Sequence, residues 1–286
     1  IYTSINVILR IEYVNYIMDK KRLKNKKFVV ILLILGIIIS FISIALWYKD
    51  RVSVQNETDL INKIVKLEEK EPDDTQLLVN PPLDENNLYW KYINTPLLEV
   101  DLSDLKDINS ETKGWIQVLG TNINYPFVQH NDNNYYLDHS FKREKNGAGW
   151  VFIDSRNNIE NLDKNTIIYA HGRIDSIMFG TLKNITKSSW YENKDNHIIR
   201  MSTEAHNTLW QVFSVYHIKT TSDYIVNNFR NDSSYDNFLK LIKERSIFKF
   251  DVDLNSNDNV LTLSTCYSKS ERVVMHAKLI KQESNK

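Results

Sequence analysis

The chain contains one cysteine, Cys266, and an arginine, Arg272, six positions later. A free thiol outside a disulfide is most often a small buried hydrophobe, but as a thiolate it is also a strong nucleophile. A single cysteine cannot form an internal disulfide. A nearby guanidinium favours a thiolate or binds a substrate carbonyl oxygen. These two residue types therefore raise nucleophilic catalysis as one hypothesis beside simple packing.

The residues before Cys266 favour the catalytic hypothesis. In 260–266 (VLTLSTC) the alternation predicts a strand with Leu261 and Leu263 on one face. Cys266 falls on the other, polar face and ends the strand. The next apolar run, 272–280, predicts a second strand that begins at Arg272. We therefore expect Cys266 and Arg272 to flank one short hairpin loop.

A nucleophilic thiol requires a proton partner, usually an imidazole. His171 is the leading candidate, because it ends the apolar run TIIYA and opens the loop HGR. His276 is second, since it lies in the strand after Arg272 and on the same face. The other histidines lie in polar stretches and are expected to be solvated: His130, His139, His197, His206 and His217.

Other kinds of site find little support in the sequence. No histidine pair has H-x-x-x-H spacing, and one cysteine cannot build a zinc cluster, so no metal site is predicted. No P-loop or G-x-G-x-x-G motif is present. The 36 basic and 36 acidic residues balance, so a basic nucleic-acid footprint is also missing.

A membrane anchor is predicted near the N-terminus. Residues 28–48 contain no charged residue, and 21 residues are long enough to cross a hydrocarbon core of roughly 30 Å. KKRLKNKK precedes the run, so the positive-inside rule places the N-terminus in the cytoplasm and the rest outside. A cleaved signal peptide is the alternative, but the run is long and no A-x-A-like site follows it. Translation is expected to begin at Met18, and residues 1–17 receive no function.

Beyond the anchor, a segment with helical patterns is followed by a segment with β-strand patterns. Leu60, Ile64 and Leu67 have helical spacing, and 102–112 predicts a second short helix. From Gly114 onward the chain is rich in short β-type runs separated by Asn, Asp, Gly and Ser, which predicts a closed barrel or sandwich of seven or eight strands. One amphipathic helix, SSYDNFLKLIKERSIF, interrupts the strands just before the cysteine strand.

These motifs together resemble the class B sortases. TLSTC with its following arginine and VVMHAKLI strand is similar to the family's active-site strand pair, and NTIIYAHGRIDSIMFGTL is similar to its histidine segment. GWIQVLGTNINYPFVQHNDNNYYLDHSF and GAGWVFIDSRN resemble the strands upstream. The match runs from about 114 to 280. The loop between Cys266 and Arg272 is shorter than in several class B members.

The resemblance implies a mainly β fold with added helices: an eight-stranded sortase-type barrel, N-terminal helices, a helix before the cysteine strand and one transmembrane helix. It implies a cysteine transpeptidase that needs no cofactor. Cys266 would be the nucleophile, His171 the acid and base, and Arg272 the transition-state stabiliser. Substrate would be contacted by residues in two strands: Ser264 and Thr265 in one, and Asn124 and Tyr125 in the other.

The implied reaction cleaves a C-terminal sorting signal of the NPQTN or NPKTG type after its threonine, through a thioacyl-enzyme. The partners would be sorting-signal-bearing surface proteins and the amine of a lipid-linked peptidoglycan precursor, at the outer face of the cell membrane. A pilin-polymerising sortase, a cysteine peptidase that transfers to water and a silent binding module are the alternatives. The expected organisation is a basic N-terminus (1–27), anchor (28–48), helical linker (49–113) and catalytic domain (114–286).

Overall fold

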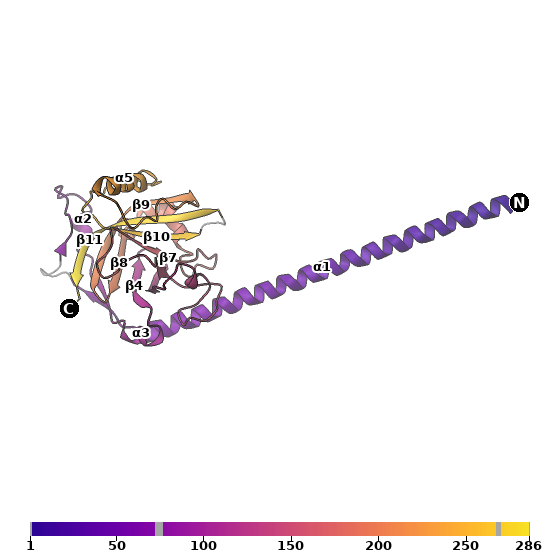
Figure 1. Cartoon of the computed structure of the whole chain (residues 1–286), viewed down its shortest axis with the longest axis horizontal. Coiled ribbons are helices and arrows are strands. Elements are labelled where there is room, and N and C mark those ends of the chain that lie inside the picture. The colour runs from indigo at the N-terminus through magenta and orange to yellow at the C-terminus, as the bar shows by residue number, and fades with distance from the viewer. Residues whose placement is uncertain (1, 72–76, 267–269, 286) are drawn as a thin grey trace. The chain divides into compact units, whose positions relative to one another are not determined.

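The computed structural model describes residues 2–71, 77–266 and 270–285, which form two compact units, residues 1–52 and 53–286 (Figure 1). Most of its secondary structure belongs to the second unit. The helices are α1 (Tyr2–Ile64), α2 (Tyr89–Tyr92), α3 (Ser103–Ile108), α4 (Ser188–Glu192), α5 (Asp232–Glu244), and the 3₁₀ turns η1 (Tyr135–Leu137), η2 (Leu182–Thr186) and η3 (Lys194–Asn196). The strands are β1 (Leu67–Lys70), β2 (Leu77–Leu78), β3 (Leu97–Val100), β4 (Thr112–Val118), β5 (Asn124–Val128), β6 (Phe152–Ile153), β7 (Asn165–Tyr169), β8 (Ile198–Thr203), β9 (His206–Lys219), β10 (Val260–Cys266) and β11 (Glu271–Ser284).

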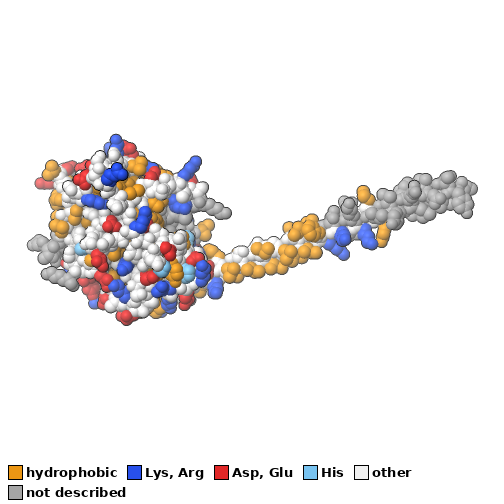
Figure 2. Space-filling model, viewed as in Figure 1, with side chains coloured by type: hydrophobic (Ala, Val, Ile, Leu, Met, Phe, Trp, Pro, Cys, Tyr) orange, Lys and Arg blue, Asp and Glu red, His pale blue; other side chains and the backbone are white. Residues whose placement is uncertain are grey.

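The long helix α1 carries the apolar stretch. Its side chains over 28–48 are exposed and hydrophobic, as Figure 2 shows along the helix. Among the described residues this is one helix with the length and composition to cross a membrane. The helix predicted after the anchor is not separate, because α1 continues without a break to Ile64. Leu67, predicted to share that helix, lies instead in β1.

Eight strands close into a barrel. In ring order they are β10, β7, β6, β5, β4, β8, β9 and β11, and pairing between β10 and β11 closes the ring. The β10–β7 and β5–β6 pairs are parallel and the remaining neighbours are antiparallel. The predicted eight-stranded mixed barrel is therefore confirmed. A closed ring leaves few unpaired strand edges, which stabilises a sheet of short strands.

The segment before the barrel is more than a helical linker. Residues 53–113 fold in the same compact unit as the barrel, and they include strands that the sequence patterns did not predict. β1 pairs with β3, and β2 pairs with the end of β11. Lys281 in β11 is buried and donates to the carbonyl oxygen of Ile93, 2.5 Å away, just after α2. This part of the chain is tied to a strand of the barrel.

The helix before the cysteine strand forms as predicted. Asn231 and Ser234 make reciprocal side-chain to backbone bonds that cap α5. Its buried face consists of Tyr235, Phe238, Leu239 and Ile242, and the helix packs beside β9 (Figure 1). The Tyr235 hydroxyl donates to the carbonyl oxygen of Asp258, 2.9 Å away, just before β10. α5 therefore also fixes the segment that leads into the strand of the cysteine.

The polar face of β10 is buried as completely as its leucine face. Leu261, Leu263 and Thr262 have no exposed surface, and Ser264 is only 4% exposed. Burial of hydroxyl groups is tolerated where each finds a hydrogen-bond partner. The polar face of β10 is therefore a buried, hydrogen-bonded surface. It lies next to the connection between β9 and α5, where Tyr224 bonds to Ser264.

Candidate active site

Two parallel strands bring His171 and Cys266 to the same edge of the barrel. In the β7–β10 pair, Tyr169 lies opposite Ser264. Each chain then continues for two residues, to His171 and to Cys266. The Thr265 hydroxyl donates to the Ala170 carbonyl oxygen at 2.7 Å. The two backbones therefore remain side by side up to the residue before each candidate catalytic group.

Arg272 reaches this edge from the other side. In the antiparallel β10–β11 pair, Cys266 lies directly opposite Arg272, a position that brings residues on neighbouring strands close together. β10 thus lies between the strand that leads to His171 and the strand that begins near Arg272. Residues 267–269, in the predicted loop between Cys266 and Arg272, lie outside the described residues.

The Arg272 guanidinium is half-buried and bonds to a backbone carbonyl of its own strand. Its Nη1 donates to the carbonyl oxygen of Glu271 at 3.1 Å. Within the described parts of the chain no carboxylate forms an ion pair with it. Its positive charge is therefore not neutralised by a described acid. Such a group can stabilise an oxyanion that forms beside it.

His171 is held through one ring nitrogen. Nε2 lies 2.6 Å from the carbonyl oxygen of Leu137, at the end of η1. A carbonyl oxygen only accepts hydrogen bonds, so Nε2 carries a proton and Nδ1 is the nitrogen left to exchange one. Gly149 makes room for this arrangement: its φ is +62°, and an added Cβ would lie 2.5 Å from the Tyr136 carbonyl oxygen and 3.1 Å from Cδ2 of His171.

The loop after His171 folds back on itself. The Phe179 amide donates to the His171 carbonyl oxygen at 3.1 Å, and Gly172 bridges to Met178. Arg173 and Asp175 form a two-pronged ion pair, with Nη2 and Oδ2 2.8 Å apart. These bonds give the segment that carries His171 a defined path.

The second candidate histidine has a different role. His276 is completely buried, and its Nε2 and Nδ1 lie 2.8 Å from the Tyr216 hydroxyl and the Thr262 hydroxyl. Burial, and then the charge of Arg245, lower its pKa to about 3. A buried imidazole with both nitrogens occupied cannot serve as a base near neutral pH. His276 is a core histidine.

His197 was expected to be solvated, and that expectation is wrong. Its residue is 3% exposed, and its ring packs against Trp190, Tyr191 and Phe250. Burial and then the charge of Lys194 lower its pKa to about 4. The residues just before His197 in the sequence are polar, so its burial could not be predicted from them. The aromatic rings that cover it come from earlier and later parts of the chain.

The four predicted substrate residues separate into two groups. Ser264 and Thr265 lie at the catalytic end of β10, where the Ser264 hydroxyl meets that of Tyr224 at 2.9 Å. Asn124 accepts a bond from Trp115 Nε1 at 2.7 Å on the neighbouring strand. Tyr125 is buried, which raises its pKa, and the Met178 amide donates to its hydroxyl. Tyr125 thus supports the loop after His171.

Two residues that contact the candidate site residues were not predicted from the sequence. Leu137 acts through its carbonyl oxygen, so its side-chain type gives no signal. Tyr224 lies in the connection between β9 and α5, is 3% exposed and is bonded to Ser264. The short apolar run Tyr224–Val226 within that connection was the available hint.

The comparisons with known proteins identify the family. A family model for the sortase domain matches residues 116–280. The chain is also similar to sortase B of Staphylococcus aureus (strain NCTC 8325 / PS 47), with 40% identity over 181 residues that cover 62% of this chain and 73% of the relative. The chain belongs to the sortase B family. It is therefore a cysteine transpeptidase, as the resemblance implied.

Solved structures of sortase B have the same fold. The Staphylococcus aureus sortase B–substrate complex matches with a TM-score of 0.59 and 39% identity, covering 63% of this chain and 84% of that one. Sortase B from Bacillus anthracis in complex with AAEK1 matches with a TM-score of 0.64 and 31% identity, covering 82% of this chain and 98% of that one. This sortase B shares the barrel and the helices around it.

Proposed function

We propose that this sortase B cleaves a C-terminal sorting signal of the NPQTN or NPKTG type and transfers the acyl group to an amine of a cell-wall precursor. The observation that carries the proposal is the strand arrangement: Cys266 opposite Arg272 on β11, and beside the β7 extension that bears His171. Family membership and a related structure described as a substrate complex support it.

The reaction follows from these three groups. The Cys266 thiolate attacks the carbonyl carbon of the signal's threonine. A C–S bond forms while Arg272 stabilises the oxyanion. Such a donor contributes about 3 kcal/mol. The C–N bond then breaks, and His171 gives a proton to the leaving amine. The acceptor amine attacks the thioester, its proton passes to His171, and the thiolate is released.

The anchor suits this task. We propose that residues 28–48 span the membrane, that residues 1–27 stay in the cytoplasm, and that the catalytic unit lies outside the cell. The basic residues before the span support this orientation, because positive charge is retained on the cytoplasmic side. Sorting-signal proteins and a lipid-linked peptidoglycan precursor both meet the enzyme at the outer face of the membrane.

Product analysis tests the transfer step. The full chain in detergent micelles is incubated with NPQTN and NPKTG peptides, with and without triglycine as amine acceptor. A transpeptidase gives the triglycine-joined acyl peptide as the main product. Hydrolysis alone, unchanged by triglycine, would favour the cysteine peptidase instead. A lysine-bearing peptide that outcompetes triglycine would indicate a pilin-polymerising enzyme.

A further inference from the structure

The connection between β9 and α5, residues 220–231, lies against the catalytic end of β10. Its Tyr224 is buried and its hydroxyl meets the Ser264 hydroxyl, two residues before Cys266. No regular helix or strand runs through this connection before α5. Its path must therefore be set by contacts with the rest of the unit.

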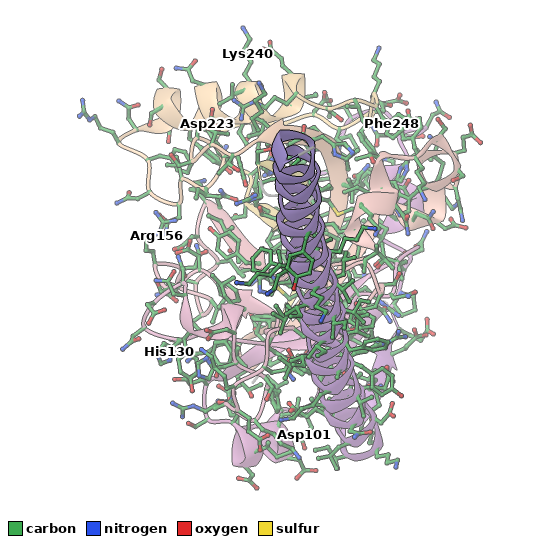
Figure 3. All side chains as sticks on the ribbon, turned by 90° about the vertical axis from the view of Figure 1, so that its right-hand side faces the viewer. Asp101, His130, Arg156, Asp223, Lys240 and Phe248 are labelled. Atoms are coloured by element: carbon green, nitrogen blue, oxygen red, sulfur yellow. The ribbon has the colours of Figure 1, made fainter. Side chains whose placement is uncertain are left out.

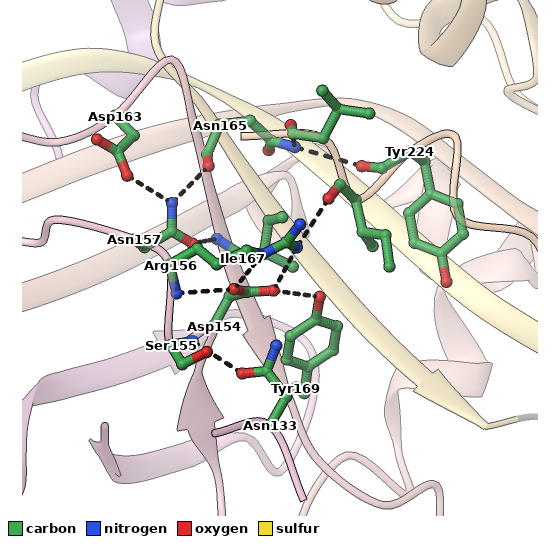
Figure 4. A network of polar contacts seen from close by, with 12 residues as sticks. Asn133, Asp154, Ser155, Arg156, Asn157, Asp163, Asn165, Ile167, Tyr169 and Tyr224 are labelled. Carbon is green, nitrogen blue, oxygen red and sulfur yellow. Dashed lines mark hydrogen bonds and ion pairs between the residues drawn. The ribbon is translucent and has the colours of Figure 1, made fainter. Parts of the chain in front are cut away.

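Three successive carbonyl oxygens of this connection are bound from the β6–β7 side. Asn165 Nδ2 lies 3.3 Å from the Tyr224 oxygen and 2.9 Å from the Val226 oxygen. Arg156 Nη2 donates to the Ile225 oxygen between them, at 3.0 Å. Figure 4 shows both donors reaching toward the same short stretch of chain. Side-chain donors thus replace the ladder that a regular strand would supply.

Arg156 is itself fixed by a buried acid. Its Nε and Nη2 donate to the two oxygens of Asp154 at 2.8 and 2.7 Å, and the Tyr169 hydroxyl donates to the same carboxylate at 2.9 Å. The Asp154 side chain is 0% exposed, whereas that of Arg156 is 51% exposed. Burial alone would raise the pKa of Asp154, but the donors from Arg156 and Tyr169 outweigh it and hold that pKa below its ordinary value.

Asn165 is equally well fixed. It has no exposed surface, and its Oδ1 accepts from the Thr262 hydroxyl at 2.6 Å on β10. On its other side the connection is held by α5, since Arg245 makes a two-pronged ion pair with Asp223. Figure 3 labels Asp223 above Arg156 in the left half of the view. The connection is therefore held by side chains of the β6–β7 region on one side and by Arg245 on the other.

We propose that Asp154, Arg156 and Asn165 form a carbonyl clamp that positions residues 224–226 as a wall of the peptide-binding site. The clamp residues are positioning residues, because they act through the connection and not on the reacting atoms. This inference rests on the proposed function for its kinetic consequence. Since Cys266, His171 and Arg272 are carried by the strand ends, loosening the clamp weakens peptide binding and leaves the chemical step largely intact.

The test uses the full chain in detergent micelles and Arg156→Met, which removes the donors while keeping a half-exposed side chain of similar length. We expect KM for the sorting peptide to rise about tenfold, as for loss of a charged hydrogen bond, with kcat within about twofold of the unmodified enzyme. Arg156→Lys should recover only part of the loss, because an ammonium cannot reproduce the fork and the third bond together.

Arg200→Met is the matched control. Arg200 is a buried arginine on β8 that bonds Gln117 and Glu69, and β8 does not border any of the three strands that carry the candidate catalytic groups. It should lower stability without raising KM. An unchanged KM in Arg156→Met, or a KM that rises equally in Arg200→Met, would overturn the clamp.

A second measurement is independent of peptide cleavage. Amide hydrogen exchange over residues 222–229 should be faster in Arg156→Met than in the unmodified chain, and unchanged in Arg200→Met. Equal exchange in all three proteins would overturn the positioning role even if no sorting peptide were cleaved. Failure of the proposed function, in contrast, would appear as an inactive unmodified enzyme.

Discussion

Two histidines lie in or next to the strands that flank β10, and the structure treats them differently. His171 follows β7, is half-buried, and has one ring nitrogen on the Leu137 carbonyl oxygen. His276 lies inside β11, is fully buried, and has a hydroxyl group at each ring nitrogen. The residue type is the same, but of the two only His171 has a ring nitrogen without a partner among the described residues, which leaves it for proton exchange.

The difference teaches how this barrel separates chemistry from packing. Near its rim, β10 ends in Cys266 opposite Arg272 and beside the His171 segment. Deeper along the same strand, Thr262 bonds to one ring nitrogen of His276, and the Tyr216 hydroxyl meets the other. A polar group with all its partners satisfied stabilises the fold, whereas one with a remaining site can take part in a reaction. Four experiments test this division.

Replacement of the nucleophile should have the largest effect. Cys266→Ala is expected to reduce sorting-peptide cleavage by about 10⁴-fold or more, since no thioester can form. Its thermal unfolding should stay within a few degrees of the unmodified chain, because the substitution removes only one sulfur atom. Initial rates and a melting curve check both parts. Activity retained in this variant would remove Cys266 from the mechanism.

The same substitution at the two histidines tests the comparison directly. His171→Leu should lower kcat by about 10³-fold, the range of a lost general acid and base, with little change in the free energy of unfolding. His276→Leu should lower the free energy of unfolding by about 3 kcal/mol, since two buried hydroxyls, of Tyr216 and Thr262, each lose a hydrogen bond to the imidazole. Activity per active-site thiol should then stay within a few-fold. Rates and denaturant titrations measure both, and the reverse pattern would make His276 the catalytic group.

Arg272→Lys sharpens the account of the rim. A lysine keeps the positive charge but not the planar fork, so kcat should fall by about 10²-fold while the free energy of unfolding hardly changes. Arg230→Lys, at an exposed position before α5, is the matched control and should be silent. Steady-state kinetics decides. Near-normal turnover in Arg272→Lys would reduce Arg272 to a surface charge.

A pH effect on stability is the smallest of the four when it is counted for each histidine. The folded-state pKa values of His197 and His276, about 4 and about 3, lie below the ordinary 6.5. The unfolded chain therefore takes up protons that the folded chain refuses, and stability that is present above pH 6.5 is lost as the pH falls toward 4. Between pH 7 and 5 we expect a loss of about 2 kcal/mol for each histidine.

Urea titrations at the two pH values measure this loss. For His276, the groups that face the ring are the Tyr216 and Thr262 hydroxyls, the Tyr224 ring and the charge of Arg245. His276→Leu should reduce the loss between pH 7 and 5 by about half, since one of the two buried imidazoles is gone. A loss that this variant leaves unchanged would assign the pH dependence to other groups.

Local patterns in the sequence predicted a closed barrel or sandwich, the helix before β10 and the apolar span, and the family resemblance selected the barrel. The sequence did not predict β8, or the strands within 53–113, where the apolar pattern is short and interrupted. It also placed Thr262, Ser264 and Cys266 on a polar face of β10, apart from the leucines. That face is buried at Thr262 and Ser264, and no local pattern in the connection before α5 indicated that this segment covers it.

For the site, residue types and order made Cys266, Arg272 and His171 the leading candidates, with His276 as the second histidine, since few residues combine a reactive side chain with a strand end. Only the tertiary structure decided what surrounds them. The Leu137 carbonyl oxygen, the burial of His276 and the clamp on residues 224–226 depend on segments far apart in the chain. The chemistry of each side chain is set by its residue type and can be predicted from the sequence. Its exposure to water and its hydrogen-bond partners are set only when the strands have paired.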